Sequence, residues 1–325
     1  MKIALIPYGL DTSTVLQPPL KYFVEKIWNA DFLTIDKLDS REGKDQFIIV
    51  SFLQVGAKDY FEKKLQNLIS KYPNNRKVLV ILEPPVVAPF MYSKKLHTYF
   101  DLILTRNKSL LKKNNYKWLP TLPFEMKRPK IQPKSFNEKK FLTLINWNKY
   151  SFVRNELYSR REKAIRYYEK NGKEFDLYWF WWDKPNFKQK IFWYQSYPSY
   201  KWPVDDKIET LSQYKFNICF ENMCNADGYV TEKIWESLQA RSVPIYRGAN
   251  DITDYIPETC FIDFRKFDKN FDKLTSYLEN MKESEYNAYI YEINKFMDDE
   301  SKFKERFGEW WAENLISIIT DFFGN

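Results

Sequence analysis

The stretch Tyr214–Gly248, YKFNICFENMCNADGYVTEKIWESLQARSVPIYRG, alternates strand, polar turn, helix and strand, and this alternation decides the fold class. Its apolar runs Phe216–Phe220 and Val243–Tyr246 predict two buried strands. Between them, Glu221–Gly228 predicts a polar loop and Tyr229–Ala240 predicts a helix. Because ligands bind where the strands of an α/β sheet pass into helices, this segment predicts a binding pocket.

The predicted helix has one polar face that suits an anionic ligand. Tyr229, Glu232 and Lys233 lie at positions i, i+3 and i+4 and therefore share this face. A helix N-terminus attracts anions, so a bound phosphate would compensate the positive charge of Lys233 in the first turn. Glu232 would repel a phosphate and is better suited to accept hydrogen bonds from sugar hydroxyls. A solvated, salt-bridged helix face explains the same spacing, which leaves both interpretations open.

The chain is basic and long enough for two domains. It has 325 residues, with 51 basic and 43 acidic side chains and a formal net charge of +8. This charge suits a diphosphate, an anionic glycolipid, a membrane surface or a nucleic acid, so charge alone does not choose among them. The aromatic region Tyr178–Tyr200 would also suit a nucleic acid, but the sequence contains no recognisable nucleic-acid-binding module. We therefore expect no nucleic-acid partner.

Cysteine usage and the apolar runs bear on the cellular compartment. The three cysteines, Cys219, Cys224 and Cys260, are odd in number and lack metal-type spacing, which favours a reducing cytoplasm. The opening MKIALIPYG predicts a first strand rather than a signal sequence. No apolar run approaches the length of a membrane-spanning helix. We expect a cytoplasmic protein and leave open a peripheral contact with the inner face of a membrane.

A charged, proline-containing segment at Glu125–Lys140 separates two series of predicted strands and helices. Its composition is typical of an interdomain linker. The elements predicted before it are strands at Ile3–Pro7, Phe47–Phe52, Val78–Leu82 and Leu102–Thr105 and a helix at Tyr60–Lys71. Phe141–Ile145 opens the second series. The sequence therefore predicts an α/β protein of two strand-and-helix domains.

A carboxylate ends one of the predicted strands of the first domain. Glu83 follows Val78–Leu82 and precedes Pro84 and Pro85, which cannot continue the strand and hold the side chain rigidly. Partial burial would raise the pKa of this carboxyl group toward the range that suits a general base. A strand-terminal carboxylate at the surface would have the same sequence, so location alone leaves both readings open.

Two arginines begin a predicted helix of the second domain. Tyr158–Tyr168, YSRREKAIRYY, carries Arg160 and Arg161 in its first turn. Arginine is preferred over lysine for contacts with a phosphate, because its planar fork can engage two oxygens. The spacing to the next predicted strand, Phe175–Tyr178, favours Arg161 as a phosphate ligand, with Arg160 and Arg154 as alternatives. A basic helix face exposed to water would explain the same residues.

The segment that carries the predicted pocket resembles the α-1,3/4-fucosyltransferases of glycosyltransferase family 10, with bacterial members the most similar. The shared motifs are Phe220-Glu221-Asn222, Tyr229–Lys233 and Val243–Gly248, followed by YIPETCFIDF at Tyr255–Phe264. The resemblance covers Leu211–Phe267 and is thinner over the rest of the chain.

Two further segments bear on this resemblance. LEPPVVAPF, which contains Glu83, is similar to the acidic-proline motif of the family, and Phe100–Lys108 also fits the family pattern. The chain departs from the pattern at Tyr178-Trp179-Phe180-Trp181, where relatives tend to have glycine after the tyrosine. This departure puts the alignment there in doubt, and with it the choice among the three arginines.

The resemblance implies the GT-B fold, in which two Rossmann-type domains face each other across a cleft, with helices at the C-terminus. We expect an acceptor-side domain at 1–130, a donor-binding domain at 131–300 and an amphipathic helix at 301–325. In the GT-B fold that the resemblance implies, a terminal helix often crosses back onto the first domain. We therefore expect the amphipathic segment Phe303–Phe323 to pack there rather than dock on a membrane.

The resemblance also implies a reaction and a role for each candidate residue. The reaction is inverting transfer of L-fucose from GDP-β-L-fucose to a lactosamine-type acceptor that contains N-acetylglucosamine, on an oligosaccharide or a glycolipid. Glu83 would be the base, Lys233 and Arg161 would stabilise the leaving diphosphate, and Tyr229 would donate a hydrogen bond to it. Glu232 would hold the ribose and Asn222 would line the nucleotide pocket.

We expect no metal or other cofactor, because the sequence contains no Asp-x-Asp pair to hold a divalent ion on the diphosphate. The only histidine, His97, lies in a predicted helix at Lys94–Phe100 and is expected to have an ordinary surface role. Two alternatives stay open: a transferase for another GDP-sugar or acceptor, and a non-catalytic protein that binds a sugar nucleotide.

Overall fold

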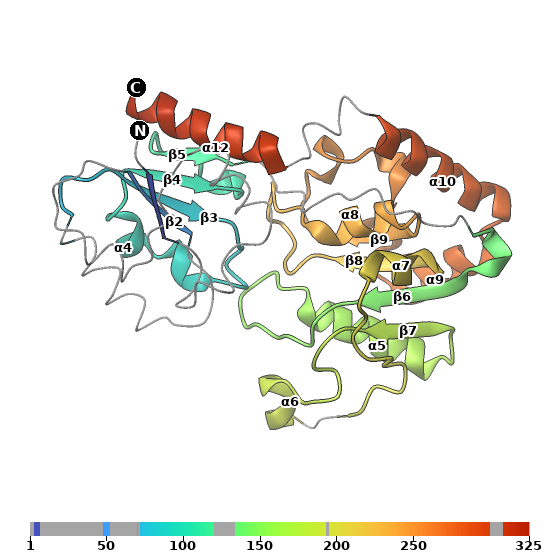
Figure 1. The fold of residues 1–325 in the computed structure, drawn as a ribbon. Helices are drawn as coiled ribbons and strands as arrows, with labels where there is room; N and C mark the ends of the chain where they lie inside the picture. Colours follow the sequence, from blue (N-terminus) through green and yellow to red (C-terminus); the bar gives the residue numbers. More distant parts are fainter. Residues whose placement is uncertain are drawn as a thin grey trace. The chain divides into compact units, whose positions relative to one another are not determined.

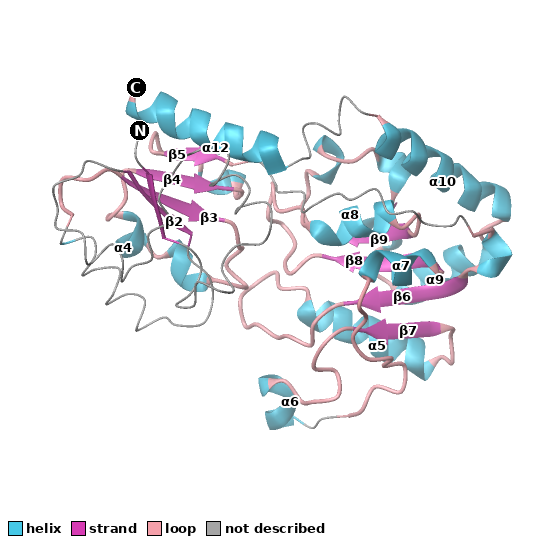
Figure 2. Ribbon diagram, viewed as in Figure 1, coloured by secondary structure: helices cyan, strands magenta, loops and turns pink. Residues whose placement is uncertain are grey.

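The computed structural model contains two compact units, each built around a parallel five-stranded sheet (Figures 1 and 2). The first unit comprises residues 1–125, 227–229 and 305–325, and the second comprises residues 126–226 and 230–304. The residues that the structure describes are 3–6, 48–52, 70, 72–119, 134–192, 195–299 and 308–324. The predicted helix Tyr60–Lys71 lies almost entirely outside them.

The sheet of the first unit has its strands in the order β1-β2-β3-β4-β5, all parallel. They are β1 (Ile3–Ile6), β2 (Ile48–Phe52), β3 (Lys77–Ile81), β4 (Leu102–Thr105) and β5 (Tyr116–Trp118). Every side chain of β3 and β4 is buried, as continuous apolar runs predict for a sheet covered on both faces. The predicted strands are confirmed to within one residue at each end.

The C-terminal helix α12 (Gly308–Phe323) is part of the first unit. Leu315 and Ile319 have no exposed surface, and the guanidinium of Arg76 donates a hydrogen bond to the carbonyl of Phe323 at 3.0 Å. The apolar face of this helix is therefore used for packing within the unit. Among the described residues, every helix is too short or too polar to cross a bilayer.

The sheet of the second unit has the strand order β10-β9-β8-β6-β7, again all parallel. The strands are β6 (Lys140–Ile145), β7 (Phe175–Tyr178), β8 (Tyr214–Phe220), β9 (Val243–Arg247) and β10 (Ile262–Asp263). The chain first adds β7 on one side of β6 and then returns to add β8 on the other side. This reversal is a topological switch point, and ligands bind outside the carboxyl ends of the strands there.

Six α-helices of the second unit are described. They are α5 (Tyr158–Lys170), α6 (Phe187–Phe192), α7 (Lys207–Ser212), α8 (Glu232–Gln239), α9 (Phe271–Asn280) and α10 (Glu283–Asp298). α5 is the first α-helix after β6, and α8 is the first after β8. Both helices therefore begin after strands that flank the switch point. The core combines apolar residues of the sheet with those of α5, α8, α9 and α10.

One prediction about the helix after β8 is wrong. α8 begins at Glu232, and Thr231 before it is extended, with φ −114° and ψ −178°. The backbone N–H and the hydroxyl of Thr231 both bind the carboxylate of Glu221, which holds this residue outside the helix. Tyr229 therefore precedes the helix and does not share a helical face with Glu232 and Lys233.

The expectation of a surface role for His97 is also wrong. Its helix, α4, spans only Lys94–His97, and the imidazole is buried. Nδ1 lies 2.8 Å from the hydroxyl of Tyr116, and Nε2 lies 2.6 Å from the carbonyl oxygen of Met91. Both ring nitrogens are thus used within the core of the first unit, which explains why the histidine is not at the surface.

Candidate functional site

The loop after β8 lies at the switch point of the second sheet. β8 pairs with β6 through Thr143 and Asn217 on one side and with β9 through Phe220 and Arg247 on the other. The loop that follows, residues 221–226, is tied to the chain segment before α5 and to the end of β9. Its backbone bonds are Leu157 N–H to Asn222 O at 2.9 Å, Cys224 N–H to Asn155 O at 2.9 Å and Asn225 N–H to Gly248 O at 3.3 Å. These bonds fix the loop where a ligand would bind.

Glu221 connects this loop to the start of α8. It has no exposed surface, and its two carboxylate oxygens accept the N–H and the hydroxyl of Thr231, each at 2.7 Å. Burial raises the pKa of Glu221, and the charge of Lys233 opposes this rise, with its Nζ 3.6 Å from a carboxylate oxygen. Gly248 lies next to the side chain of Glu221. A Cβ atom at position 248 would overlap the Cγ of Glu221. Glu221 is thus a structural connection within the site.

Glu232 and Lys233 form an ion pair in the first turn of α8. Lys233 Nζ lies 3.0 Å from Glu232 Oε1 and 2.9 Å from the hydroxyl of Thr231. Burial favours the neutral form of Glu232, but the charges of Lys233 and Lys207 outweigh it and lower the pKa to about 2. Burial likewise lowers the pKa of Lys233, but Glu232 and Glu221 outweigh it and raise this pKa above its usual value. Lys233 is therefore a fixed positive charge held between two carboxylates.

Arg161 is the most buried of the three candidate arginines. Its side chain is 2% exposed, and Nε and Nη2 donate to the carbonyl of Phe220 at 3.1 and 2.6 Å. Nη2 also donates to Asn222 Oδ1 at 3.0 Å. The guanidinium thus brings α5 to the carboxyl end of β8 and orients Asn222. Arg160 is half-buried and Arg154 is exposed.

Arg247 is a charged residue of this region that the sequence reasoning missed. It ends β9, and its carbonyl accepts the backbone N–H of Glu221 at 2.8 Å. Its Nη2 lies 3.7 Å from Cys224 Sγ, whereas its buried Nε and Nη1 have no hydrogen-bond partner among the described residues. Burial, and then the charge of Arg247, lowers the pKa of Arg160. The only sequence signal was an arginine at the end of the strand in VPIYRG.

The candidate base and Tyr229 belong to the first unit. Glu83 follows β3, and its carbonyl accepts the hydroxyl of Tyr92 at 3.0 Å. The segment 227–229 packs in the same unit, where the hydroxyl of Tyr229 donates to Glu83 Oε2 at 3.5 Å. Gly228 has φ +85°, and a Cβ atom there would overlap the carbonyl of Arg106. Glycine is thus required for the close approach that places Tyr229 beside Glu83.

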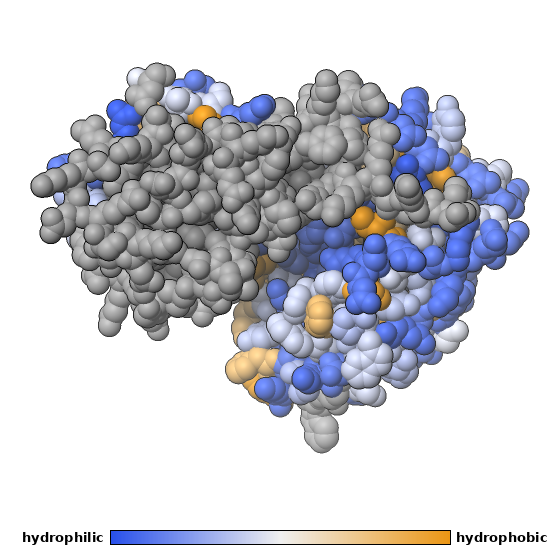
Figure 3. Space-filling view, viewed as in Figure 1, coloured by the Kyte–Doolittle hydropathy of each residue, from blue (hydrophilic) through white to orange (hydrophobic). Residues whose placement is uncertain are grey.

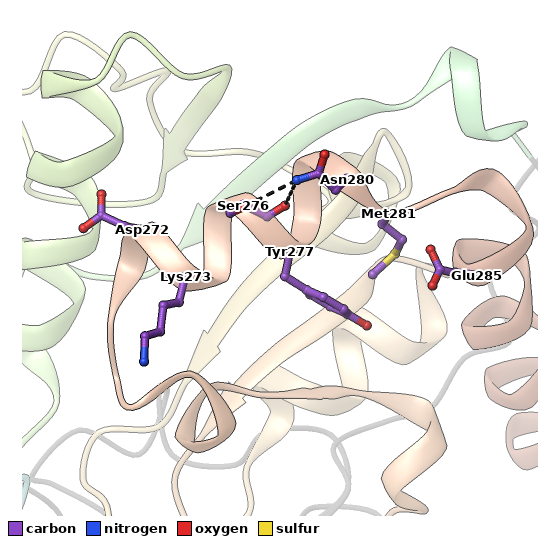
Figure 4. A pocket seen from close by; sticks show the side chains of 7 residues that line it. All are labelled: Asp272, Lys273, Ser276, Tyr277, Asn280, Met281 and Glu285. Carbon is purple, nitrogen blue, oxygen red and sulfur yellow. Dashed lines mark hydrogen bonds between the residues drawn. The ribbon is translucent and has the colours of Figure 1, made fainter.

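A hollow elsewhere on the second unit is unrelated to the strand ends. It is lined by α9 and the residues up to the start of α10 (Figure 4): Asp272, Lys273, Ser276, Tyr277, Asn280, Met281 and Glu285. The side-chain amide of Asn280 donates to the carbonyl of Ser276 at 2.8 Å, within α9 itself. None of these residues belongs to the loops at the carboxyl ends of β6, β8 or β9. The candidate site is therefore the region around Glu221, and not this hollow.

Sequence comparison agrees with the motifs at this site. Residues 194–309 match the family model described as glycosyltransferase family 10 (fucosyltransferase), C-terminal. The chain is 42% identical over 88 residues to the alpha-(1,3)-fucosyltransferase FucT of Helicobacter pylori, covering 27% of this chain and 18% of that protein. It is 37% identical over 84 residues to an alpha-(1,4)-fucosyltransferase of Arabidopsis thaliana, covering 24% of this chain and 20% of that protein. The matched stretch thus spans at most a fifth of each of these two relatives.

Solved structures similar to this one are glycosyltransferases of the GT-B fold. An alpha1,3-fucosyltransferase with GDP-fucose has a TM-score of 0.53 and 15% identity, covering 89% of this chain and 81% of that chain. An alpha-glucosyltransferase in complex with UDP has a TM-score of 0.58 and 11% identity, covering 98% of this chain and 99% of that chain. At such identities the likeness concerns the fold, and it confirms the predicted α/β, GT-B class. Residues 194–309 are thus a glycosyltransferase family 10 (fucosyltransferase) domain, as the motifs implied, in a chain of GT-B fold.

Proposed function

We propose that this chain is an inverting fucosyltransferase. It transfers L-fucose from GDP-β-L-fucose to a hydroxyl of a lactosamine-type acceptor that contains N-acetylglucosamine, forming an α-1,3 linkage. The observation that supports this best is the position of the family motif Phe220-Glu221-Asn222 at the switch point of the second sheet, followed directly by the start of α8. In an α/β sheet this is the position at which a nucleotide binds.

The donor diphosphate would meet the positive charges around this loop. Lys233, held in its charged form by Glu232 and Glu221, is suited to stabilise the negative charge that develops on the leaving phosphate. Arg161 is held against Phe220 and Asn222, so we propose that it positions Asn222 in the nucleotide pocket and adds its charge to that of Lys233. Glu232, 29% exposed, would accept hydrogen bonds from the ribose.

Glu83 would act as the general base. The carboxylate accepts the proton of the acceptor hydroxyl while that oxygen attacks the anomeric carbon and GDP departs, so no covalent intermediate forms. Tyr229 was expected to donate to the diphosphate. Its hydroxyl donates to Glu83 Oε2 at 3.5 Å, so we propose that Tyr229 orients the base instead.

We further propose a glycolipid or lipopolysaccharide-type acceptor at the cytoplasmic face of a membrane, because the net charge of +8 suits an anionic surface. A protein-linked glycan is the alternative acceptor. We also propose that transfer needs no metal ion, since Lys233 and the arginines can supply the positive charge.

Release of GDP from GDP-fucose tests this function. The full chain is assayed with and without N-acetyllactosamine, in EDTA, beside Glu83→Gln and Lys233→Ala. We expect release that depends on the acceptor and persists in EDTA. Glu83→Gln should lower kcat by about 10²- to 10⁴-fold with donor affinity unchanged, because it removes only the base. Lys233→Ala should also weaken binding of the donor.

The outcomes separate the proposal from its alternatives. A chain that binds GDP-fucose but releases no GDP, with Glu83→Gln indistinguishable from wild type, would be a sugar-nucleotide-binding protein. Faster release of GDP from another GDP-sugar than from GDP-fucose would show that the other sugar nucleotide is the donor. Complete loss of GDP release in EDTA would disprove the metal-free mechanism. Thermal unfolding of each variant controls for loss of the fold.

A further inference from the structure

The loops that follow β6 and β7, together with α6, expose a cluster of large apolar side chains. We call this cluster the aromatic patch; its members are Trp147, Tyr150, Phe152, Phe180, Trp181, Phe187 and Ile191. Nine large apolar side chains are exposed in the described part of the chain, and five of them belong to this patch. Figure 3 shows hydrophobic side chains gathered among hydrophilic ones over α6, which Figure 1 labels.

The aromatic rings of the patch pack against one another in two groups. The ring centroid of Trp147 lies 4.5 Å from that of Trp181 and 4.8 Å from that of Phe180. Tyr150 stacks on Phe187 at 5.5 Å. The outer members of the patch nevertheless face solvent, with Trp181 50%, Phe187 54% and Ile191 56% exposed, and Phe152 reaches 77%. Exposure of this extent in one place marks an interaction surface.

A buried asparagine fixes the loops of the patch. Asn148 is 4% exposed, and the two protons of its amide nitrogen are shared among the carbonyls of Trp181 and Lys184 and the side-chain oxygen of Gln189, at 2.9, 3.0 and 3.1 Å. Its amide oxygen accepts the side chain of Asn186 at 2.8 Å. A single residue in the loop after β6, Asn148, thus holds the loop after β7 and the start of α6. The patch is therefore a fixed surface.

The backbone of the patch is strained. Trp179 has φ +96° and Trp181 has φ +71°, in a region that tryptophan rarely occupies. Such conformations persist where the surrounding structure imposes them, and they gather at functional sites. The indole of Trp181, at one of these positions, is 50% exposed.

The charges around the patch are mostly positive. Residues 147–152 and 179–191 contain four lysines, Lys149, Lys184, Lys188 and Lys190, against one aspartate, Asp183. Lys188 lies 3.9 Å from Glu162 of α5, whereas Lys149, Lys184 and Lys190 are exposed. Long cationic side chains next to exposed aromatic ones can reach lipid headgroups while the rings enter the acyl region.

We propose that the aromatic patch docks the second unit on an anionic membrane surface. Phe152, Phe187 and Ile191 carry no polar group that would recognise a soluble sugar, and their exposure in water is unfavourable until they are buried. The lysines match the charge of the headgroups. The apolar side chains Leu315 and Ile319 of the amphipathic helix α12 are buried, so among the described residues the patch holds most of the exposed large apolar side chains. This inference stands on exposure and charge and does not depend on the transfer reaction.

Sedimentation of the full chain with vesicles tests the proposal. The vesicles contain either phosphatidylcholine alone or phosphatidylcholine with phosphatidylglycerol. We expect the wild-type chain to bind chiefly to the anionic vesicles. The double variant Phe152→Ser/Phe187→Ser, called the serine pair, should have a partition coefficient at least about tenfold lower, since two large apolar contacts are removed. Lys149→Glu/Lys190→Glu should lose binding to anionic vesicles specifically.

Tyr291→Ser is the matched control, because Tyr291 is 66% exposed on α10, outside the patch. It should bind the vesicles as wild type does, and the serine pair should keep the wild-type unfolding temperature. Wild-type chain that stays in the supernatant with anionic vesicles would overturn the proposal, as would equal binding by the serine pair and wild type. If soluble N-acetyllactosamine instead displaces the chain from vesicles, the patch binds glycans and the membrane assignment is wrong.

Discussion

The carboxylate of Glu221 accepts both the backbone N–H and the hydroxyl proton of Thr231, ten residues further along the chain. Through these two bonds the end of β8 fixes the first residue before α8. The hydroxyl oxygen of Thr231 in turn accepts a hydrogen bond from Lys233 Nζ at 2.9 Å. The position of the lysine charge therefore depends on Glu221. The buried carboxylate of Glu221 thus holds the start of α8, which carries the candidate donor-binding residues, in a fixed position relative to the sheet.

Glu221→Ala should lower the free energy of unfolding by about 3 kcal/mol, because it leaves Thr231 N–H unsatisfied and removes one partner of a buried ion pair. Urea unfolding at equilibrium measures this. Glu258→Ala is the control, since Glu258 forms an exposed ion pair with Lys266 and should cost less than about 1 kcal/mol. Equal losses in the two variants would contradict a special role for Glu221.

The buried imidazole of His97 should make the free energy of unfolding of the first unit depend on pH. Burial lowers the pKa of this imidazole below its ordinary value of 6.5, although the hydrogen bond to Met91 O opposes the shift. Below pH 6.5 the unfolded chain therefore binds a proton that the folded chain resists. The free energy of unfolding should fall as the pH drops through and below this value.

The chain has one histidine, so a single imidazole resonance reports this pKa by NMR. We expect the midpoint of that titration below 6.5, and a free energy of unfolding that declines as the pH falls from 6.5 through that midpoint. His97→Gln should remove most of this slope. A midpoint above 6.5 would show that the charged form is favoured and would reverse the predicted sign.

The sequence predicted the apolar strands of both sheets closely, because continuous apolar runs such as Val78–Leu82 have few other uses in a chain of this kind. The family motif Phe220-Glu221-Asn222 predicted a loop after β8, and the structure places it at the switch point of the second sheet. The start of α8 was misplaced because Thr231 and Glu221 are ten residues apart, and no local pattern encodes their bond. The burial of His97 was missed for the same reason, since its partner Tyr116 lies 19 residues further along the chain, on strand β5.

Gly248→Ala should destabilise the second unit by about 3 kcal/mol through overpacking, because a Cβ atom would overlap Glu221 and the ring of Tyr246. Gly172→Ala is the matched control. Gly172 has open space around it and φ +59°, so alanine there should cost about 1 kcal/mol from backbone strain alone. Chemical denaturation compares the two. A cost at Gly248 no greater than at Gly172 would show that Glu221 and Tyr246 yield freely.

Arg247→Met should raise the free energy of unfolding of the ligand-free protein. Nε and Nη1 of Arg247 are buried, with no hydrogen-bond partner in the described ranges, and the neighbouring charge of Arg160 repels the guanidinium. The nearby carboxylates are used elsewhere, Glu221 by Thr231 and Glu156 by Ser159. Replacing a buried charge that has no carboxylate partner among the described residues with an apolar side chain of similar length should therefore add about 1 kcal/mol.

Arg265→Met provides the comparison for this last change. Arg265 Nε donates to both oxygens of Asp263 at 2.9 Å, so its replacement breaks a formed ion pair and should lower stability. Urea unfolding of the two variants should thus shift in opposite directions. If Arg247→Met loses stability as Arg265→Met does, the guanidinium makes favourable contacts in the folded protein, and its unpaired nitrogens are satisfied in solution.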